Sequence, residues 1–229
     1  MLFRSFSLSA TALGADYPNI YVGIEGGYSK PLKKKFKHVE SGSIGNLTGS
    51  KVYEGKIGYR FDESMAIELS YAYRPDYELK LDIPDEDLYT NMHSKGKVKY
   101  HAIMANIVYF AQPINRTTPY FLAGIGYSRV SPQKTPIYGD IPLMGMKEQE
   151  VGNVMKHKTE RLGFRIGAGV DVAMSDHLAL TFGGKLEVVN NIRLNTRFIN
   201  IMTKQEVRRE SIKKTIGIGE LTAGLKYSF

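Results

Sequence analysis

The last nine residues, Leu221 to Phe229, constrain the fold of this chain more than any other stretch. Read in steps of two, one set of positions is apolar and ends in two aromatics: Leu221, Ala223, Leu225, Tyr227 and Phe229. The other set is small or polar: Thr222, Gly224, Lys226 and Ser228. Side chains of a β-strand alternate between two faces. The pattern therefore predicts a strand with one apolar face that finishes in an aromatic pair.

The same period of two recurs along the chain. It is found in residues 19–29, 51–61, 65–74, 101–109, 119–128, 161–174 and 178–188, and the last strand begins at residue 216. Apolar residues such as Ile20, Ile67 and Leu180 alternate there with glycine, polar or charged residues, whereas an amphipathic helix would show a period of 3.6. The segment 101–109 is the weakest, because both of its faces are rather apolar. We therefore predict eight strands, each able to cross a bilayer, which takes about 9–11 tilted residues.

The connections between these strands alternate in length. Residues 62–64, 111–118 and 175–177 are short links, whereas residues 30–50, 75–97, 129–159 and 190–214 are long. Transmembrane barrels have short periplasmic turns and long extracellular loops. The predicted fold class is therefore all-β, an eight-stranded antiparallel up-and-down transmembrane β-barrel with both termini on the periplasmic side. The competing fold, a soluble lipocalin-like barrel, would need the apolar face inside and the charged face outside.

Five motifs resemble one family of such barrels. They are the segments 21–28 (YVGIEGGY), 57–71 (IGYRFDESMAIELSY), 119–126 (PYFLAGIG), 167–172 (GAGVDV) and 224–229 (GLKYSF). In this order they are similar to the OmpA/opacity superfamily of eight-stranded outer-membrane barrels, in the style of rickettsia-type surface antigens and adhesins. The terminal Phe229 resembles the C-terminal signature by which outer-membrane proteins are recognised for assembly. The resemblance implies an integral protein of the bacterial outer membrane.

Residues 1–15 differ in character from the rest. They contain one basic residue, Arg4, followed by a stretch of Ser, Ala and Leu and by small residues before Asp16. This pattern is similar to the end of a secretory signal peptide. We expect residues 1–15 to be a truncated signal peptide and residues 16–229 to form the barrel domain.

The non-lipid faces of the predicted strands carry charges of both signs. The expected lumen set is Glu25, Glu54, Lys56, Arg60, Glu68, Arg161, Arg165, Asp171, Lys185, Glu187, Glu220 and Lys226. An eight-stranded barrel has room only for packed side chains or one small ligand, and buried charges must be paired. We therefore interpret this set as a charge network that fills the lumen and fixes strand register. A narrow ion channel is the alternative.

The long connections account for much of the formal net charge of +8. Their basic residues form two groups, one of Lys33, Lys34, Lys35 and Lys37 and one of Arg193, Arg197, Arg208, Arg209, Lys213 and Lys214. Loops on a rigid scaffold commonly carry function, and basic surfaces attract anionic partners. Candidate partners are an acidic host surface protein, a sulfated glycan and lipopolysaccharide or other outer-membrane lipid. Simple contact with anionic headgroups at the barrel rim explains the charge equally well, and no base-reading geometry for nucleic acid is indicated.

The residues that carry catalysis or metal chemistry are sparse. The chain has no Cys, and its five histidines, at positions 38, 93, 101, 157 and 177, are scattered over predicted loops, a turn and a lipid-facing position. We expect no catalytic residues, no metal and no cofactor. The predicted function is that of a monomeric, non-enzymatic, adhesin-like surface protein, with a purely structural barrel or a narrow channel as alternatives.

Overall fold

The computed structural model describes residues 20–32, 35–37, 44–82, 90–133, 135–141, 145–154, 158–199 and 206–229. The expected leader, residues 1–15, and the two lysines Lys33 and Lys34 lie outside these residues. A search of the described residues finds no helix with the length and apolar character needed to cross a membrane.

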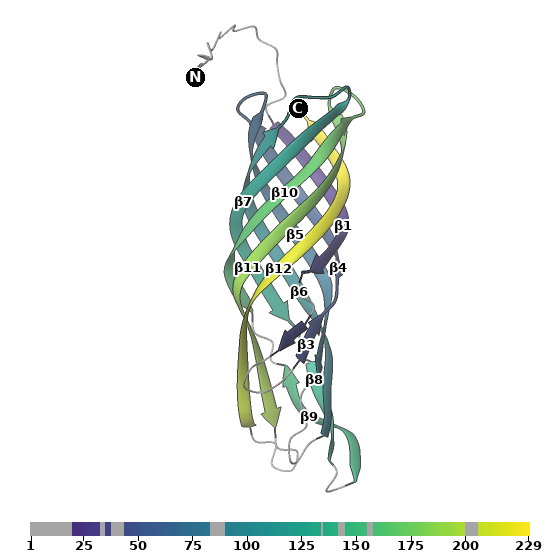
Figure 1. The fold of residues 1–229 in the computed structure, drawn as a ribbon, viewed down its shortest axis with the longest axis vertical. Coiled ribbons are helices and arrows are strands. Elements are labelled where there is room, and N and C mark those ends of the chain that lie inside the picture. The colour runs from purple at the N-terminus through teal and green to yellow at the C-terminus, as the bar shows by residue number, and fades with distance from the viewer. Residues whose placement is uncertain are drawn as a thin grey trace, which may run out of the picture.

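Eight long strands close into a barrel (Figure 1). They are β1 (Ile20–Pro31), β4 (Ser50–Arg60), β5 (Met65–Asp82), β6 (Thr90–Phe110), β7 (Thr117–Pro132), β10 (Thr159–Ala173), β11 (Leu178–Ile199) and β12 (Glu206–Ser228). Each pairs antiparallel with its neighbours, and the last strand pairs with the first through positions such as Tyr227 opposite Val22. The predicted eight-stranded antiparallel barrel is confirmed.

The short links form tight turns for a local reason. In the link between β4 and β5, Asp62 Oδ1 accepts hydrogen bonds from the backbone N–H groups of Ser64 and Met65, both at 2.7 Å. These bonds from Ser64 and Met65 hold the pKa of the Asp62 carboxyl below its usual range. An Asp side chain that bonds the backbone two residues further on is a favoured turn former, which explains why the chain reverses at this point.

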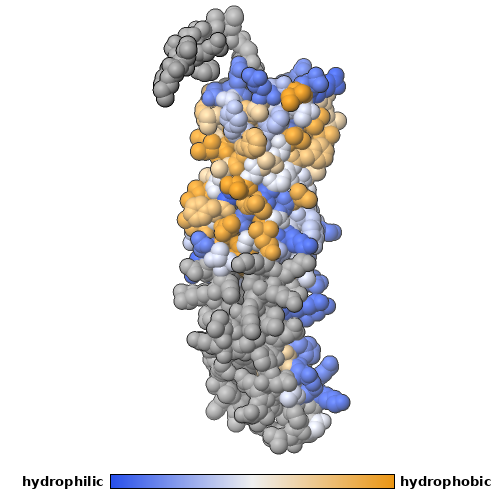
Figure 2. Space-filling model, in the orientation of Figure 1, coloured by the Kyte–Doolittle hydropathy of each residue, from blue (hydrophilic) through white to orange (hydrophobic). Residues whose placement is uncertain are grey.

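The outside of the barrel is apolar over a broad band. Exposed residues there include Ile24, Tyr59, Leu69, Ile107 and Phe121, whereas charged residues that alternate with them in the band, such as Glu25, Glu54 and Glu68, are buried. Figure 2 shows apolar side chains gathered over the half of the molecule nearest the short turns, with hydrophilic side chains at that end and along the described part of the other half. The competing lipocalin-like fold is wrong, because it requires the opposite facing.

The strands continue far beyond this band, so the expectation of long loops is largely wrong. Most of residues 75–97, 129–159 and 190–214 is strand, and four short strands join the sheet: β2 (Lys35–Lys37), β3 (Ile44–Leu47), β8 (Thr135–Ile141) and β9 (Met146–Val154). Beyond Val98, β6 leaves β7 and pairs with β8, β8 pairs with β9, and β9 pairs with β11. In this part of the wall, the β8–β9 hairpin lies between β6 and β11, where β7 and β10 lie in the rest of the barrel. We call this part of the molecule, beyond the apolar band on the side away from the short turns, the extension.

A β-bulge in β5 marks the beginning of the extension. The pairing of β5 with β6 shifts between Arg74 and Tyr77. Before the shift, odd-numbered residues such as Tyr71 are exposed, but after it the odd-numbered Tyr77 and Leu79 are buried. A bulge adds one residue to one strand of a pair, and a slip of one residue exchanges the two faces. The period-two pattern of β5 therefore breaks at Pro75.

Candidate functional site

The lumen contains a network of ion pairs centred on Glu187 of β11, which is fully buried. Its Oε2 accepts hydrogen bonds from Arg74 Nη2 at 2.9 Å and from Arg165 Nη2 at 3.0 Å. Its Oε1 accepts hydrogen bonds from Ser128 Oγ at 3.0 Å and from the Tyr100 hydroxyl. Buried charges are tolerated when they are paired and hydrogen-bonded. This one carboxylate therefore ties together five strands: β5, β6, β7, β10 and β11.

A second cluster surrounds Glu25 of β1. Glu25 Oε2 accepts a hydrogen bond from Lys185 Nζ at 2.7 Å, and its Oε1 accepts one from Lys56 Nζ. Lys185 Nζ also lies 3.0 Å from Glu54 Oε2, and Lys56 Nζ lies 3.8 Å from Glu68 Oε2. The cations and carboxylates alternate in this cluster, so each like-charged pair is separated by an opposite charge.

The end of the lumen nearest the short turns mixes charges with aromatic rings. Lys226 of β12 pairs with Asp171 of β10. The ring of Phe110 lies 4.9 Å from Lys226 Nζ and 4.1 Å from the guanidinium carbon of Arg60. A cation over an aromatic face within about 6 Å is attracted by the ring. These contacts hold both cations at the end of the lumen nearest the short turns.

The two clusters form one packed plug. Arg165 joins them, because its Nη1 donates to Glu54 Oε1 at 3.0 Å. In the described lumen, six buried carboxylates face five buried cations, and the half-buried Arg60 supplies a sixth. A cavity lined by Lys56, Asp171 and Lys226, among others, has a volume of about 10 Å³, which is room for about one water molecule. The geometry is that of a filled lumen.

Two residues differ from the expected charge set. Arg74 was not in that set, yet it is fully buried and also bonds Glu220 through its Nε. Its position in phase with Glu68 in β5 was the signal that could have identified it. Arg161 was in the set, but it is only half-buried, at the end of β10 nearest the extension, where its Nη1 donates to the backbone oxygen of Glu160 at 2.8 Å.

The basic residues of the predicted loops lie on strands of the extension. Lys35 and Lys37 belong to β2, at one end of the sheet order. The second group lies on the β11–β12 hairpin, where Arg193 pairs with Lys213, Arg197 with Arg209, Phe198 with Arg208 and Ile192 with Lys214. No described pairing joins β2 to this hairpin. The backbone thus brings the second group together in register.

The extension has an apolar interior. Buried residues there include Tyr77, Leu79, Met92, Val98 and Ile137, which form one cluster with the apolar residues at the adjacent end of the lumen. The exterior of the same strands is charged, with Lys80, Lys95 and Lys97 exposed and Asp76 exposed beside Lys97. A buried apolar cluster with a charged exterior is the arrangement of a soluble β-structure.

Histidines do not assemble a site in the described residues. His93 and His101 lie on outward positions of β6, and His101 Nδ1 is within 2.7 Å of the Tyr71 hydroxyl. His177 lies in a turn, with its ring stacked near Tyr227. A search of the described residues for three or more clustered metal-ligating side chains finds none.

These features agree with what comparison with known proteins shows. A model of the outer membrane protein beta-barrel domain matches residues 2–229. The chain belongs to this family. The predicted resemblance to outer-membrane barrels is confirmed, and the protein is an integral outer-membrane β-barrel.

The chain is also similar to a known sequence and to solved structures. The chain is 26% identical over 185 residues to the uncharacterized protein RP788 of Rickettsia prowazekii (strain Madrid E), and the match covers 77% of this chain and 98% of that protein. OprG of Pseudomonas aeruginosa has a similar structure, with a TM-score of 0.55 and 13% identity, covering 92% of this chain and 96% of that one. Neisserial surface protein A gives a TM-score of 0.51 and 16% identity, covering 92% and 97%. At these identities the two structures show a shared fold.

Proposed function

We propose that this protein is a non-enzymatic surface-recognition protein whose β11–β12 hairpin binds an anionic partner, with sulfated glycans as the class of ligand. The observation that carries the proposal is the register of that hairpin. Arg193 lies opposite Lys213 and Arg197 opposite Arg209, with the neutral pair Asn195 and Ser211 between them. Like charges directly opposite each other destabilise a sheet. An anionic ligand across these pairs would offset that repulsion.

The length of the strands supports the proposal. Strand β12 has 23 residues and β11 has 22, whereas about 9–11 tilted residues cross the hydrocarbon. Roughly half of each strand therefore stands outside the membrane, since a strand rises about 3.3 Å per residue. A barrel with only a structural role has no need of this extension, whereas a recognition surface does.

The filled lumen favours recognition over conduction. The Glu187 and Glu25 clusters occupy the middle of the barrel, and an apolar cluster that includes Met104, Val189 and Ile218 fills the end next to the extension. An ion would have to break buried pairs and cross that apolar layer. We therefore assign the charge network a structural role in fixing the barrel, and the binding role to the outside.

The test is binding of intact cells displaying the protein to immobilised heparin. One variant neutralises the hairpin pairs: Arg193→Gln, Arg197→Gln, Arg209→Gln and Lys213→Gln. Its matched control removes the same charge elsewhere on the extension: Lys80→Gln, Lys95→Gln, Lys97→Gln and Lys147→Gln. We expect binding to fall at least tenfold in the first variant and to change less than twofold in the control.

Two results would contradict this function. An equal loss in both variants would mean that binding follows overall charge. The second is that the parent protein does not bind heparin although its heat-modifiable migration shows a folded barrel. A purely structural barrel would then be the better interpretation.

A further inference from the structure

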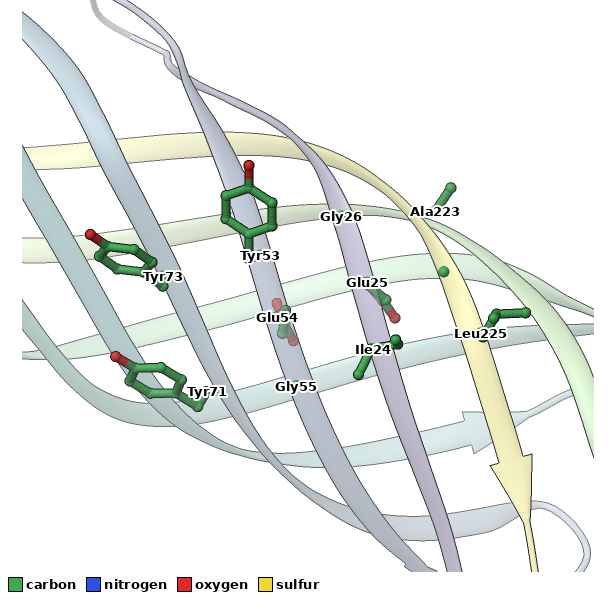
Figure 3. Close-up of a pocket in the computed structure, with 11 residues that line it drawn as sticks. Ile24, Glu25, Gly26, Tyr53, Glu54, Gly55, Tyr71, Tyr73, Ala223 and Leu225 are labelled. Atoms are coloured by element: carbon green, nitrogen blue, oxygen red, sulfur yellow. The ribbon is translucent and has the colours of Figure 1, made fainter.

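Two hollows lie on the outside of the barrel, within and at the edge of the apolar band. The first, which we call the tyrosine hollow, has a volume of about 620 Å³ and is walled by Tyr53, Tyr71 and Tyr73 over a floor that includes Gly26 and Gly55 (Figure 3). The second, which we call the Lys30 hollow, has a volume of about 660 Å³ and spans β1, β12 and β11. Both volumes fall in the range of about 300–1,000 Å³ that small-molecule sites occupy.

The Lys30 hollow exists because two outward positions lack side chains. Its floor includes Gly184 of β11 and Gly219 of β12, and its walls include Tyr28, Leu32 and Leu221. A Cβ at Gly184 would lie 3.6 Å from Leu221 Cδ2, and a Cβ at Gly219 would lie 3.5 Å from Leu32 Cδ2. These are ordinary contact distances, so the backbone would accept a larger residue at either position.

An inward glycine shows the contrast. A Cβ at Gly224 would lie 2.0 Å from the backbone oxygen of Ile24, so that glycine is required by close packing of the wall. The floor of the Lys30 hollow has no such requirement. Its glycines leave open a space that a side chain could have filled.

Charge distinguishes the Lys30 hollow from the tyrosine hollow. Lys30 is exposed, lies opposite Gly219 in register, and lines the hollow. Within the described part of the chain it has no ion-pair partner. Lys213, which pairs with Arg193, lies further along β12 toward the extension. The tyrosine hollow has only Glu25 and Glu54 among its charged lining residues, and both carboxylates belong to the lumen.

The position of Lys30 suits one kind of molecule. It comes two residues after the exposed Tyr28 and is the first charged residue among the exposed positions of β1. Tyrosines are enriched at the interface between hydrocarbon and headgroups, and cations beside it attract anionic headgroups. An apolar hollow on the barrel wall with an exposed cation in its lining is complementary to an acyl chain that carries a phosphorylated headgroup.

We propose that the Lys30 hollow binds one phosphorylated, acylated lipid of the outer leaflet, with an acyl chain over Gly184 and Gly219 and a phosphate at Lys30. The site is distinct from the glycan surface proposed above, since it lies on the barrel wall and needs no charge from the hairpin pairs. It also differs from general lipid contact, because it predicts a stoichiometric lipid at one place on the wall.

The experiment compares lipid retention by matched variants. The protein is extracted from outer membranes in a mild detergent, and native mass spectrometry counts the phosphorylated lipid bound per barrel. Gly219→Leu fills the Lys30 hollow and Lys30→Gln removes its cation. The controls are Gly55→Leu, which fills the tyrosine hollow at a position open to space, and Lys51→Gln, which removes an exposed cation of β4.

We expect one retained lipid in the parent protein, at least a tenfold loss in Gly219→Leu and Lys30→Gln, and no change in the two controls. Refolding into vesicles that contain the same lipid with or without its phosphate separates the headgroup from the chain, and only the phosphorylated form should be retained. Equal retention by all four variants, or retention of the dephosphorylated lipid to the same level, would overturn the proposal. Heparin binding measured on the same variants should stay unchanged, so this site and the glycan surface can fail independently.

Discussion

The membrane barrel and the extension are made by the same strands but have opposite organisation. In β6, the barrel part exposes Ile103, Ile107 and Tyr109, whereas the extension part exposes Lys95 and Lys97. The inner face changes in the opposite sense. The barrel buries ion pairs, and the extension buries an apolar cluster.

The difference shows that the solvent sets the pattern of each region. Where lipid surrounds the wall, apolar side chains face outward and the polar groups must find partners inside. Where water surrounds it, the apolar side chains are buried as in a soluble sheet. The backbone pairing is continuous through both regions, so strand continuity alone does not reveal the boundary. Four predictions test this comparison.

The largest effect is expected from the centre of the lumen network. Glu187→Gln leaves Arg74 and Arg165 without the carboxylate that they share, and removing one partner of a buried ion pair costs about 3–5 kcal/mol. We expect the free energy of unfolding of the barrel, measured by urea titration in lipid vesicles, to fall by that amount.

The matched control for this substitution is Glu160→Gln. Glu160 pairs with Arg129 on the outside, and both side chains are well exposed, at 38% and 50%. Exposed pairs contribute about 0–1 kcal/mol. Similar losses in Glu187→Gln and Glu160→Gln would show that the lumen is wet enough to screen its charges.

The facing of the barrel strands could be predicted from the sequence because the barrel wall is regular. A period of two separates Ile67 and Leu69 from Glu68 and Ser70 without any structural information. The lumen charges follow from the same period, and the structure places eleven of the twelve expected residues on the inner wall of the barrel, with Arg161 at its rim.

The extension could not be predicted in the same way, for two physical reasons. The bulge between Arg74 and Tyr77 exchanges the faces of β5. A prediction that keeps the same alternation of faces through the bulge finds no period of two across it, and so predicts a loop. A second irregularity, between Val189 and Ile192, does the same in β11. Nor does local sequence show that β8 and β9 insert between β6 and β11, because that pairing joins distant segments.

A charge on the lipid-facing wall should have the next largest effect. Leu69 is 53% exposed on the apolar band, and Leu69→Arg would place a charge against hydrocarbon. Such a substitution costs about 2–4 kcal/mol near the bilayer midplane. The fraction of protein that folds into vesicles and shows heat-modifiable migration should fall accordingly.

The same substitution in the extension is the comparison. Tyr138 of β8 is 40% exposed, so Tyr138→Arg meets water and should change the free energy of unfolding by no more than about 0.5 kcal/mol. If the two substitutions lowered the free energy of unfolding equally, the extension would have to be embedded in lipid. The boundary between membrane barrel and extension would then be wrong.

A smaller effect is expected in the apolar interior of the extension. Ile137 is fully buried, and Ile137→Val removes one methylene-sized group, which costs about 0.5–1.5 kcal/mol. Hydrogen exchange of β8 and β9 amides should quicken, while exchange in the barrel part of β1 and β4 stays as in the parent. Uniform quickening over both regions would indicate that barrel and extension unfold as one unit.

The smallest effect concerns a hydrogen-bonded carboxylate at the surface of the extension. The Asn91 side chain donates to Asp140 Oδ2 at 2.9 Å and the backbone N–H of Glu148 donates to Oδ1 at 2.9 Å, so the pKa of Asp140 lies below its usual value. A depressed pKa means that the folded state favours the charged form. The contribution to stability is therefore present above the unfolded pKa of about 4 and is lost as pH falls through the folded value. Protease protection of the β8–β9 hairpin should decline slightly between pH 5 and pH 3. The control is Asp140→Asn, measured at each pH. An identical pH profile in that variant would show that the Asp140 bonds do not hold the hairpin to β6.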